Sequence, residues 1–142
     1  MNLKTLIARI RIQKLRVKTL SPRKKLLKLR LRERNNSMSI TNLNSKDFSD
    51  FIADECVVVD FYADWCGPCQ MLSPILEDVA KQFKQVKFGK INVDQANDIA
   101  NLYQVRSIPT IFFFKKGKIS NFFTGFTPKE KIIEFINTNI NT

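Results

Sequence analysis

The 142-residue chain contains no histidine and only three cysteines. Without histidine, neither a cysteine–histidine protease nor any mechanism with a histidine general base is possible. A structural zinc site almost always takes four Cys or His ligands, so the sequence predicts no metal. A secreted disulfide scaffold would carry a denser, even set of cysteines. The composition therefore favours redox use of one cysteine pair, with the third cysteine left over.

Long apolar runs are also absent, since no stretch approaches the ~20 residues that a membrane helix needs. The longest candidates, residues 57–63 and 108–114, have the length of strands. We therefore expect no integral membrane segment. An apolar share of 44%, with 12 phenylalanines, is enough for a real core, and the length allows one domain with one accessory segment.

Charge is distributed unevenly along the chain. Residues 1–37 contain 13 Lys and Arg and one acid, Glu33, for a net charge of +12. Residues 38–142 contain the other 11 basic residues and 12 acidic residues, for a net charge of −1. This predicts a basic leader over 1–37, outside the fold, and a nearly neutral domain over 38–142. The near-neutral domain argues against nucleic-acid binding.

The leader is rich in arginine, poor in acids and imperfectly amphipathic, and Ser21-Pro22 could start a second helix within it. Three interpretations remain open. It is an organelle transit peptide, which would place the protein in the mitochondrial or another organelle matrix. Alternatively, Met38 is the true initiator and the protein is cytoplasmic. In the third, the leader is a basic arm for nucleic acid or anionic membrane, or simply a solvated tail.

Two cysteines lie where a predicted strand meets a predicted helix. The β-branched run 57–63 predicts a buried strand, and apolar residues at helical spacing follow it over 67–84. Pro68 suits the first helical turn, so Cys66 lies at the helix N-terminus, where unpaired N–H groups and the helix dipole favour a thiolate. Cys66 and Cys69 are one helical turn apart and can be bridged. The stretch predicts a site that makes and breaks a disulfide.

Strands and helices alternate along the rest of the domain. This pattern, ending in a hairpin and a helix, predicts an α/β fold with a mixed sheet and helices on both faces. The predicted elements are an edge strand at 40–43, a helix capped by Asn44 or Ser45, a strand at 56–62, a helix at 67–84 interrupted by Pro74, a strand at 86–93, a helix at 95–103, a hairpin of 108–114 with 118–123, and a helix at 128–139.

These motifs together resemble the thioredoxin family, over roughly residues 39–141. The resemblance implies the thioredoxin fold, and the ordered set of motifs is far more specific than a lone C-x-x-C. The matching stretches are Trp65-Cys66-Gly67-Pro68-Cys69, Val59-Asp60-Phe61, Pro74, Lys90-Ile91-Asn92-Val93-Asp94, Arg106-Ser107-Ile108-Pro109-Thr110, Phe114-Lys115-Lys116-Gly117 and Gly125.

The resemblance implies a protein-disulfide reductase that maintains cell redox homeostasis. Cys66, nearer the helix N-terminus, is the expected nucleophile, and Cys69 resolves the mixed disulfide. We expect no bound cofactor, recycling by an external thioredoxin reductase, and a monomer that acts on protein disulfides. Gly-Pro between the cysteines is typical of the reducing members. The alternatives are an oxidase or isomerase of the same fold, and a redox-inert binding subunit.

Asp60 is the second candidate catalytic residue. A carboxylate within an apolar strand is costly unless it has a partner, and burial should raise its pKa. Asp60 could then exchange a proton with Cys69 during resolution. By resemblance, Lys90 lies near this carboxylate. The alternative is a solvated aspartate at the edge of the fold.

The remaining candidates form the substrate surface. By resemblance, the Ile108-Pro109 bond is cis, its proline faces the cysteine pair, and its loop offers backbone pairing to an extended substrate. A plain loop proline is the alternative. Gly67, Pro68 and Gly125 complete this surface, with Trp65 as an apolar platform.

Three other positions stand out. Cys56 reads as a small buried hydrophobe rather than as a regulatory thiol. Tyr62 stands where many relatives have Trp. Phe126 stands where the family usually has a small residue, which alters the rim of the substrate groove.

Overall fold

The computed structural model describes residue 4, residues 21–27 and residues 39–142. The chain divides into two units, Met1–Met38 and Ser39–Thr142. In the first unit residues 22–27 are helical, as Ser21-Pro22 predicts, and the hydroxyl oxygen of Ser21 lies 3.5 Å from the Lys24 nitrogen that donates to it. Apart from Lys4 and these residues, the predicted leader lies outside the described residues. In the described part of the chain, no helix is long and apolar enough to cross a membrane.

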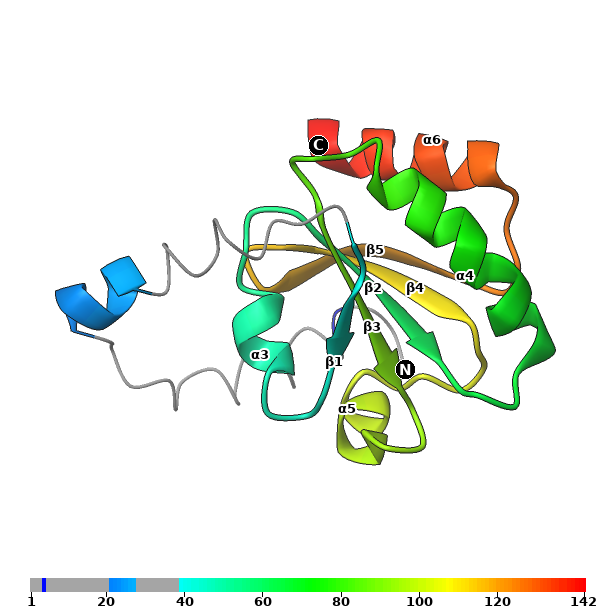
Figure 1. Cartoon of the computed structure of the whole chain (residues 1–142), viewed down its shortest axis with the longest axis horizontal. Coiled ribbons are helices and arrows are strands. Elements are labelled where there is room, and N and C mark those ends of the chain that lie inside the picture. The colour runs from blue at the N-terminus through cyan, green and yellow to red at the C-terminus, as the bar shows by residue number, and fades with distance from the viewer. Residues whose placement is uncertain (1–3, 5–20, 28–38) are drawn as a thin grey trace. The chain divides into compact units, whose positions relative to one another are not determined.

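The second unit is built on a five-stranded mixed sheet (Figure 1). Its strands run in the order β1-β3-β2-β4-β5. β1, β3 and β2 are parallel, whereas β4 pairs antiparallel with both β2 and β5. The strands are β1 (Thr41–Leu43), β2 (Val57–Tyr62), β3 (Lys87–Asn92), β4 (Thr110–Lys115) and β5 (Lys118–Thr124). The predicted edge strand, central strand and hairpin are confirmed.

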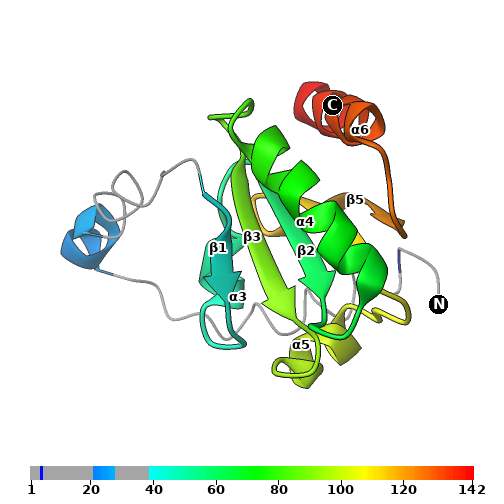
Figure 2. The same ribbon diagram turned by 45° about the vertical axis from the view of Figure 1, so that its right-hand side comes forward.

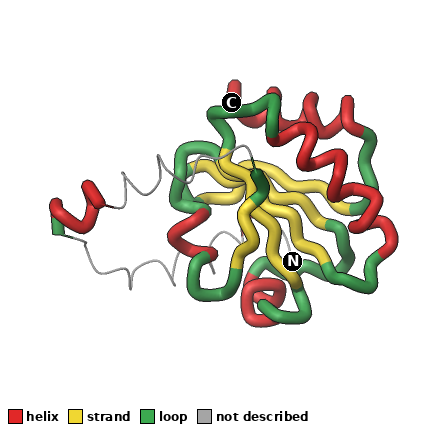
Figure 3. The backbone as a smooth tube through the Cα atoms, in the orientation of Figure 1, coloured by secondary structure: helices red, strands yellow, loops and turns green. Residues whose placement is uncertain are grey.

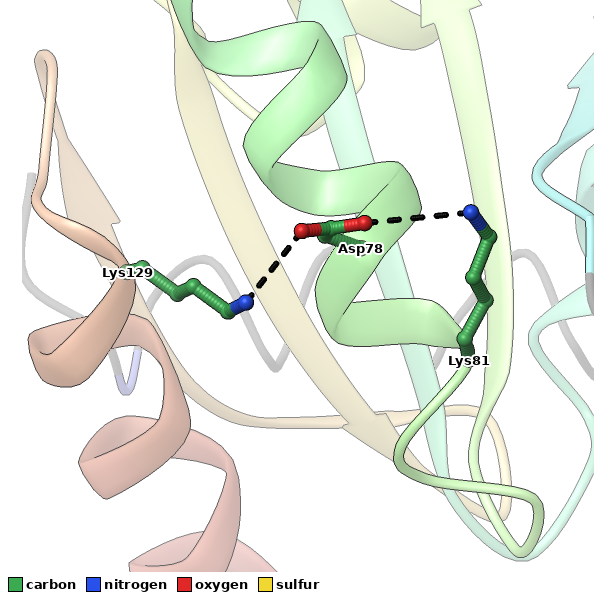
Figure 4. Close-up of polar contacts among 3 residues, drawn as sticks. All are labelled: Asp78, Lys81 and Lys129. Atoms are coloured by element: carbon green, nitrogen blue, oxygen red, sulfur yellow. Dashed lines mark hydrogen bonds and ion pairs between the residues drawn. The ribbon is translucent and has the colours of Figure 1, made fainter.

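Four helices pack against this sheet: α3 (Phe48–Phe51), α4 (Gly67–Ala80), α5 (Asn97–Leu102) and α6 (Lys129–Asn141). α4 and α6 lie side by side on one face (Figures 1 and 2), and Figure 3 shows the short α3 and α5 apart from that pair. Outside the core, Asp78 of α4 lies between Lys129 of α6 and Lys81 (Figure 4). The predicted thioredoxin fold, with helices on both faces, is confirmed.

The two faces of the sheet have different cores, because successive strand side chains point to opposite faces. Under α4 and α6 the core is largely aliphatic and includes Val58, Leu72, Leu76, Ile132 and Ile136. The other face is aromatic, with edge-on or stacked rings contributed by α3, by the end of α5 and by the strands. These rings are Phe48, Phe61, Tyr103, Phe112 and Phe114.

Two local predictions differ from the structure. The Asn44 side chain does not cap a helix directly, because its oxygen accepts the backbone N–H groups of Lys46 and Asp47 at 2.8 and 3.0 Å. This side-chain turn holds residues 44–47 out of the helix, so α3 begins only at Phe48.

The long helix also ends earlier than its apolar periodicity predicts. α4 runs through Pro74 but stops at Ala80, and residues 81–84 form turns. Phe83 is buried all the same. The apolar spacing therefore predicted burial correctly beyond the point where the helix ends.

Candidate active site

The cysteine pair lies in the turn that joins β2 to α4. The Cys66 N–H donates to the Ala63 carbonyl at 3.2 Å, and the extended backbone of Cys66 makes it the N-cap of α4. Pro68 follows in the first turn, where its missing N–H costs nothing. The Cα atoms of Cys66 and Cys69 are 5.3 Å apart and the two side chains form a disulfide. The predicted strand-to-helix placement is confirmed.

The Cys66 sulfur is stabilised by the start of the helix. Its Sγ accepts the backbone N–H of Cys69 at 3.2 Å, and a helix N-terminus carries a partial positive charge. Both effects favour the thiolate once the disulfide is reduced. Cys66 and Cys69 are only 4% and 3% exposed. The reactive pair is therefore largely covered by the surrounding residues.

A cis-proline loop lies beside the cysteine pair. The Ile108–Pro109 peptide bond is cis, as the resemblance implies, and the plain-loop alternative is wrong. The Ile108 carbonyl oxygen lies 3.8 Å from Cys66 Sγ, and Ile108 packs against the cluster of Ala63, Cys66 and Cys69. The Pro109 carbonyl accepts the Gly125 N–H at 2.8 Å. The structure thus joins residues 108–109 and 125 to the cysteine pair.

The exposed rim of the site comes from the β2–α4 turn itself. Trp65 is 71% exposed, and its indole Nε1 donates to Asp94 Oδ2 at 2.9 Å. Gly67 and Pro68 are exposed beside it, and a Cβ built on Gly67 would meet no atom within 4 Å. Asp94 was in the matching sequence but had no predicted role. Only the fold brings it to the tryptophan, 29 residues away.

Asp60 is buried in the middle of the sheet. It is 5% exposed, and its Oδ1 has no hydrogen-bond partner among the described residues. Burial raises the pKa of the Asp60 carboxyl to about 7, while the positive charge of Lys90 acts in the opposite direction. Lys90 is the register partner of Asp60 on β3. The predicted burial and the predicted proximity of Lys90 are both confirmed, and the solvated alternative is wrong.

Cys56, at the start of β2, differs from the reactive pair. It is buried and free, and burial raises the pKa of its thiol. This agrees with its interpretation as a small buried hydrophobe. Elsewhere in the described part of the chain, no three His, Cys, Asp or Glu side chains are grouped so as to hold a metal.

Comparison with known proteins identifies relatives that agree with the fold and with the bridged cysteine pair. The family model described as Thioredoxin matches residues 39–138. The chain belongs to the thioredoxin family. A thioredoxin of Mycoplasmoides gallisepticum is 52% identical over 80 residues, covering 56% of this chain and 80% of the relative. A thioredoxin of Chlamydia pneumoniae is 45% identical over 95 residues, covering 67% of this chain and 93% of the relative.

Solved structures agree with this assignment. A mutant thioredoxin from Halobacterium salinarum superposes with a TM-score of 0.69 at 31% identity, covering 72% of this chain and 92% of that one. Family members act on protein disulfides and are themselves reduced by thioredoxin reductase. With the bridged pair Cys66–Cys69 in place, the chain is a protein-disulfide reductase that works by dithiol–disulfide exchange.

Proposed function

We propose that Cys66 is the attacking residue and Cys69 the resolving residue of this exchange. The observation that carries the assignment is the hydrogen bond from the Cys69 N–H to Cys66 Sγ at the N-cap of α4. It stabilises negative charge on the Cys66 sulfur. Cys69 lies inside the first turn of α4, and we assign it the second step.

The reaction transfers two electrons from the pair to the substrate. The Cys66 thiolate attacks one sulfur of the substrate disulfide, forms a mixed disulfide and releases the other sulfur as a thiolate. The Cys69 sulfur, once deprotonated, attacks Cys66 Sγ. This forms the Cys66–Cys69 disulfide and releases the second substrate thiolate. The substrate is reduced and the pair is oxidised.

We propose that Asp60 accepts the Cys69 proton in the second step. Asp60 is buried and unpartnered at Oδ1, and a carboxyl with a pKa of about 7 is partly ionised at neutral pH. Lys90 contributes by favouring the ionised form. A rate of mixed-disulfide resolution that follows the same pH profile in Asp60→Asn as in the parent would remove this role.

The substrate surface is proposed to combine the rim of the β2–α4 turn with the cis-proline loop. Trp65, Gly67 and Pro68 offer an exposed edge beside Cys66. Ile108 packs against the cysteine cluster, and the Gly125–Pro109 hydrogen bond joins Gly125 to the same loop. An extended chain carrying a disulfide would lie between these two edges.

Trapping the mixed disulfide tests the order of attack. In the Cys69→Ser variant, a disulfide substrate should stay covalently bound to Cys66 until dithiothreitol releases it. The matched Cys66→Ser variant should bind no substrate covalently, because Cys69 lies inside the first turn of α4 and not at its N-cap, where Cys66 Sγ accepts the backbone N–H. Accumulation of the adduct in Cys66→Ser instead would reverse the two roles.

The equilibrium potential of the pair tests the direction of electron flow. Reference potentials of other proteins are about −270 mV for thioredoxin and about −120 mV for a strongly oxidising relative. We expect a value near the first, with a thioredoxin reductase as donor. A value above about −180 mV would favour the oxidase or isomerase. Failure of the pair to exchange at all would favour the redox-inert subunit.

We further propose that residues 39–142 act as a monomer, because one chain supplies the cysteines, the buried carboxylate and the cis-proline. Sedimentation equilibrium of the active protein tests this. A mass of two chains at the concentrations of the assay would contradict it.

The leader is proposed to direct the protein to an organelle matrix, such as that of the mitochondrion, and to be removed there. The proposal rests on its 13 basic residues and single acid. Mass spectrometry of the first peptide of the native protein tests it. An N-terminal residue within the leader other than Met1, or just after the leader but other than Met38, supports cleavage. An intact Met1, or a start at Met38, contradicts it.

A further inference from the structure

Tyr62 lies on the same side of the sheet as Asp60. Side chains two residues apart on a strand share a face, and Val58, two residues before Asp60, packs under α4. Tyr62 is half-buried and packs against the cluster of Ala63, Cys66 and Cys69. Tyr62 therefore lies next to the reactive pair, on the face of β2 that also carries the buried carboxylate.

The same ring contacts the lysine that acts on Asp60. The Lys90 ammonium nitrogen lies 5.5 Å from the centre of the Tyr62 ring, within the range of a cation–π interaction. Lys90 is half-buried and is the register partner of Asp60 across β2 and β3. A lysine side chain is long and flexible, so its charge stays near one place only where something holds it. The cation–π contact with the Tyr62 ring restrains the Lys90 ammonium group in this way.

We propose that Tyr62 is a positioning residue for disulfide exchange, whose ring keeps the Lys90 ammonium beside the buried Asp60 carboxylate. The inference rests on the proposed role of Asp60 as the proton acceptor. Tyr62 touches no reacting atom in this scheme and acts only through Lys90. Its consequence is that the ring, through Lys90, lowers the pH range in which Asp60 ionises below the range that burial alone would set.

The other groups around Asp60 do not provide an alternative anchor. β4 places the apolar Ile111 opposite it, and α4 contributes Cys69 to the cluster against which Tyr62 packs. Burial first, then the charges of Asp64 and Asp60, raise the pKa of the Tyr62 phenol, so the ring is uncharged at neutral pH. Lys90 is thus the positive charge that opposes the burial of Asp60.

Substitutions at Tyr62 separate the ring from the hydroxyl. Tyr62→Phe keeps the ring and loses only the hydroxyl. Tyr62→Leu removes the ring. If that variant does not fold, Tyr62→Met is used in its place, because it also lacks the ring. Lys90→Met removes the charge itself, and the double variant with Tyr62→Leu shows whether the two act together.

The measurement is the titration of the Asp60 carboxyl by carbon NMR in the full chain, with Asp60→Asn to assign the signal. In Tyr62→Leu, the Asp60 pKa should rise by about half a pH unit. At a fixed pH below the pKa, the ionised fraction of Asp60 should then be roughly threefold smaller than in the parent. Tyr62→Phe should titrate like the parent. In the Lys90→Met background, which should itself raise the pKa, removal of the ring should cause no further rise.

Two results would overturn the inference. One is an Asp60 titration in Tyr62→Leu that matches Tyr62→Phe or moves to lower pH. The other is a rise that persists in full without Lys90, since the ring would then act by excluding water. Failure of Asp60 as a proton acceptor would be seen separately, as an unchanged pH–rate profile in Asp60→Asn. The carboxyl titration does not depend on that outcome.

Discussion

The two ends of the central strand β2 differ in how their polar groups are satisfied. Near the amino end, Lys87 forms a 3.0 Å ion pair with Asp54 and also lies 4.1 Å from the centre of the Phe51 ring. Toward the carboxyl end, Asp60 is buried with Oδ1 unpartnered among the described residues. The cis Ile108–Pro109 bond and the positive φ of Gly125 belong to that same end. The first end of β2 thus has a paired charge, whereas the second has a buried carboxylate with one oxygen unpartnered among the described residues.

The same difference between the two ends of β2 is seen in two cysteines, Cys56 before the strand and Cys66 after it. Cys56 and Cys66 are 9% and 4% exposed, so burial does not distinguish them. Burial raises the pKa of the Cys56 thiol, whereas Cys66 Sγ accepts a backbone N–H at the start of α4. The position of the sulfur relative to helix N–H groups, not its exposure, distinguishes Cys66 from Cys56.

The largest expected effect is on activity, and alanine variants at the two cysteines test it. Cys66→Ala should reduce protein-disulfide reduction to the uncatalysed background, because no other described cysteine lies at a helix N-terminus in its place. Cys56→Ala should retain most of the activity and lose only some packing. Turnover of a disulfide-containing protein by both variants is the measurement. Equal losses in the two would make the comparison of the cysteines untenable.

The next effect is on stability and concerns the buried carboxylate. The folded pKa of Asp60, about 7, exceeds its ordinary value of 3.8, so protonation favours the folded state. The stabilisation is complete below about pH 4 and is lost as pH rises through about 7. The full difference corresponds to about 4 kcal/mol at 1.36 kcal/mol per pH unit. Asp60→Asn, which cannot ionise, should be more stable than the parent at pH 8 by up to that amount.

Denaturant unfolding of both proteins at pH 5 and pH 8 measures this effect. Asp54→Asn is the matched variant at the other end of β2, where loss of the ion pair with Lys87 should cost about 1 kcal/mol or less. Glu77→Gln, at an exposed position on α4, controls for removal of an acid. If Asp60→Asn were less stable than the parent at pH 8, the carboxylate would have to be satisfied in solution by a partner.

A smaller effect is expected from the glycines beside the site. Gly125 has φ +93, where an L side chain is strained, although a Cβ there would meet no atom within 4 Å. Gly125→Ala should destabilise the fold by about 1–2 kcal/mol through the backbone alone. Gly67 is equally open and has no such φ, so Gly67→Ala is the control and should change little. Thermal unfolding of the two variants distinguishes strain from crowding, since similar losses in both would contradict a backbone cause.

The sequence predicted most of this arrangement, because strong local signals coincide with it. The apolar run of β2, Pro68 after Cys66 and the apolar spacing of α4 fixed the strand-to-helix placement of the pair. Contacts between distant segments were harder to predict. The bond from Trp65 to Asp94 and the contact of Lys90 with the Tyr62 ring depend on which strands become neighbours. Asn44 misled the prediction of the first helix start, because its side chain can organise either a cap or a turn.

The smallest effect is expected at Asp78, an exposed residue of α4 (Figure 4). Its carboxylate pairs with Lys129 at 3.2 Å and with Lys81 at 3.7 Å, and both contacts are exposed to solvent. The hydrogen bond and charge of Lys129, with a contribution from Lys81, lower the Asp78 pKa. Any stabilisation is therefore present above the ordinary carboxyl pKa and is lost as the pH falls through the lowered value.

Asp78→Asn should shift the thermal midpoint less than Gly125→Ala does, and added salt should remove the difference from the parent. The reason is that α6 is held on α4 mainly by apolar burial, with Ile132 and Ile136 fully buried in the shared core. Thermal unfolding at low and high salt, at neutral pH, is the measurement. A salt-insensitive loss as large as that of Gly125→Ala would mean that the ion pair, and not the apolar contact, sets the packing of α6.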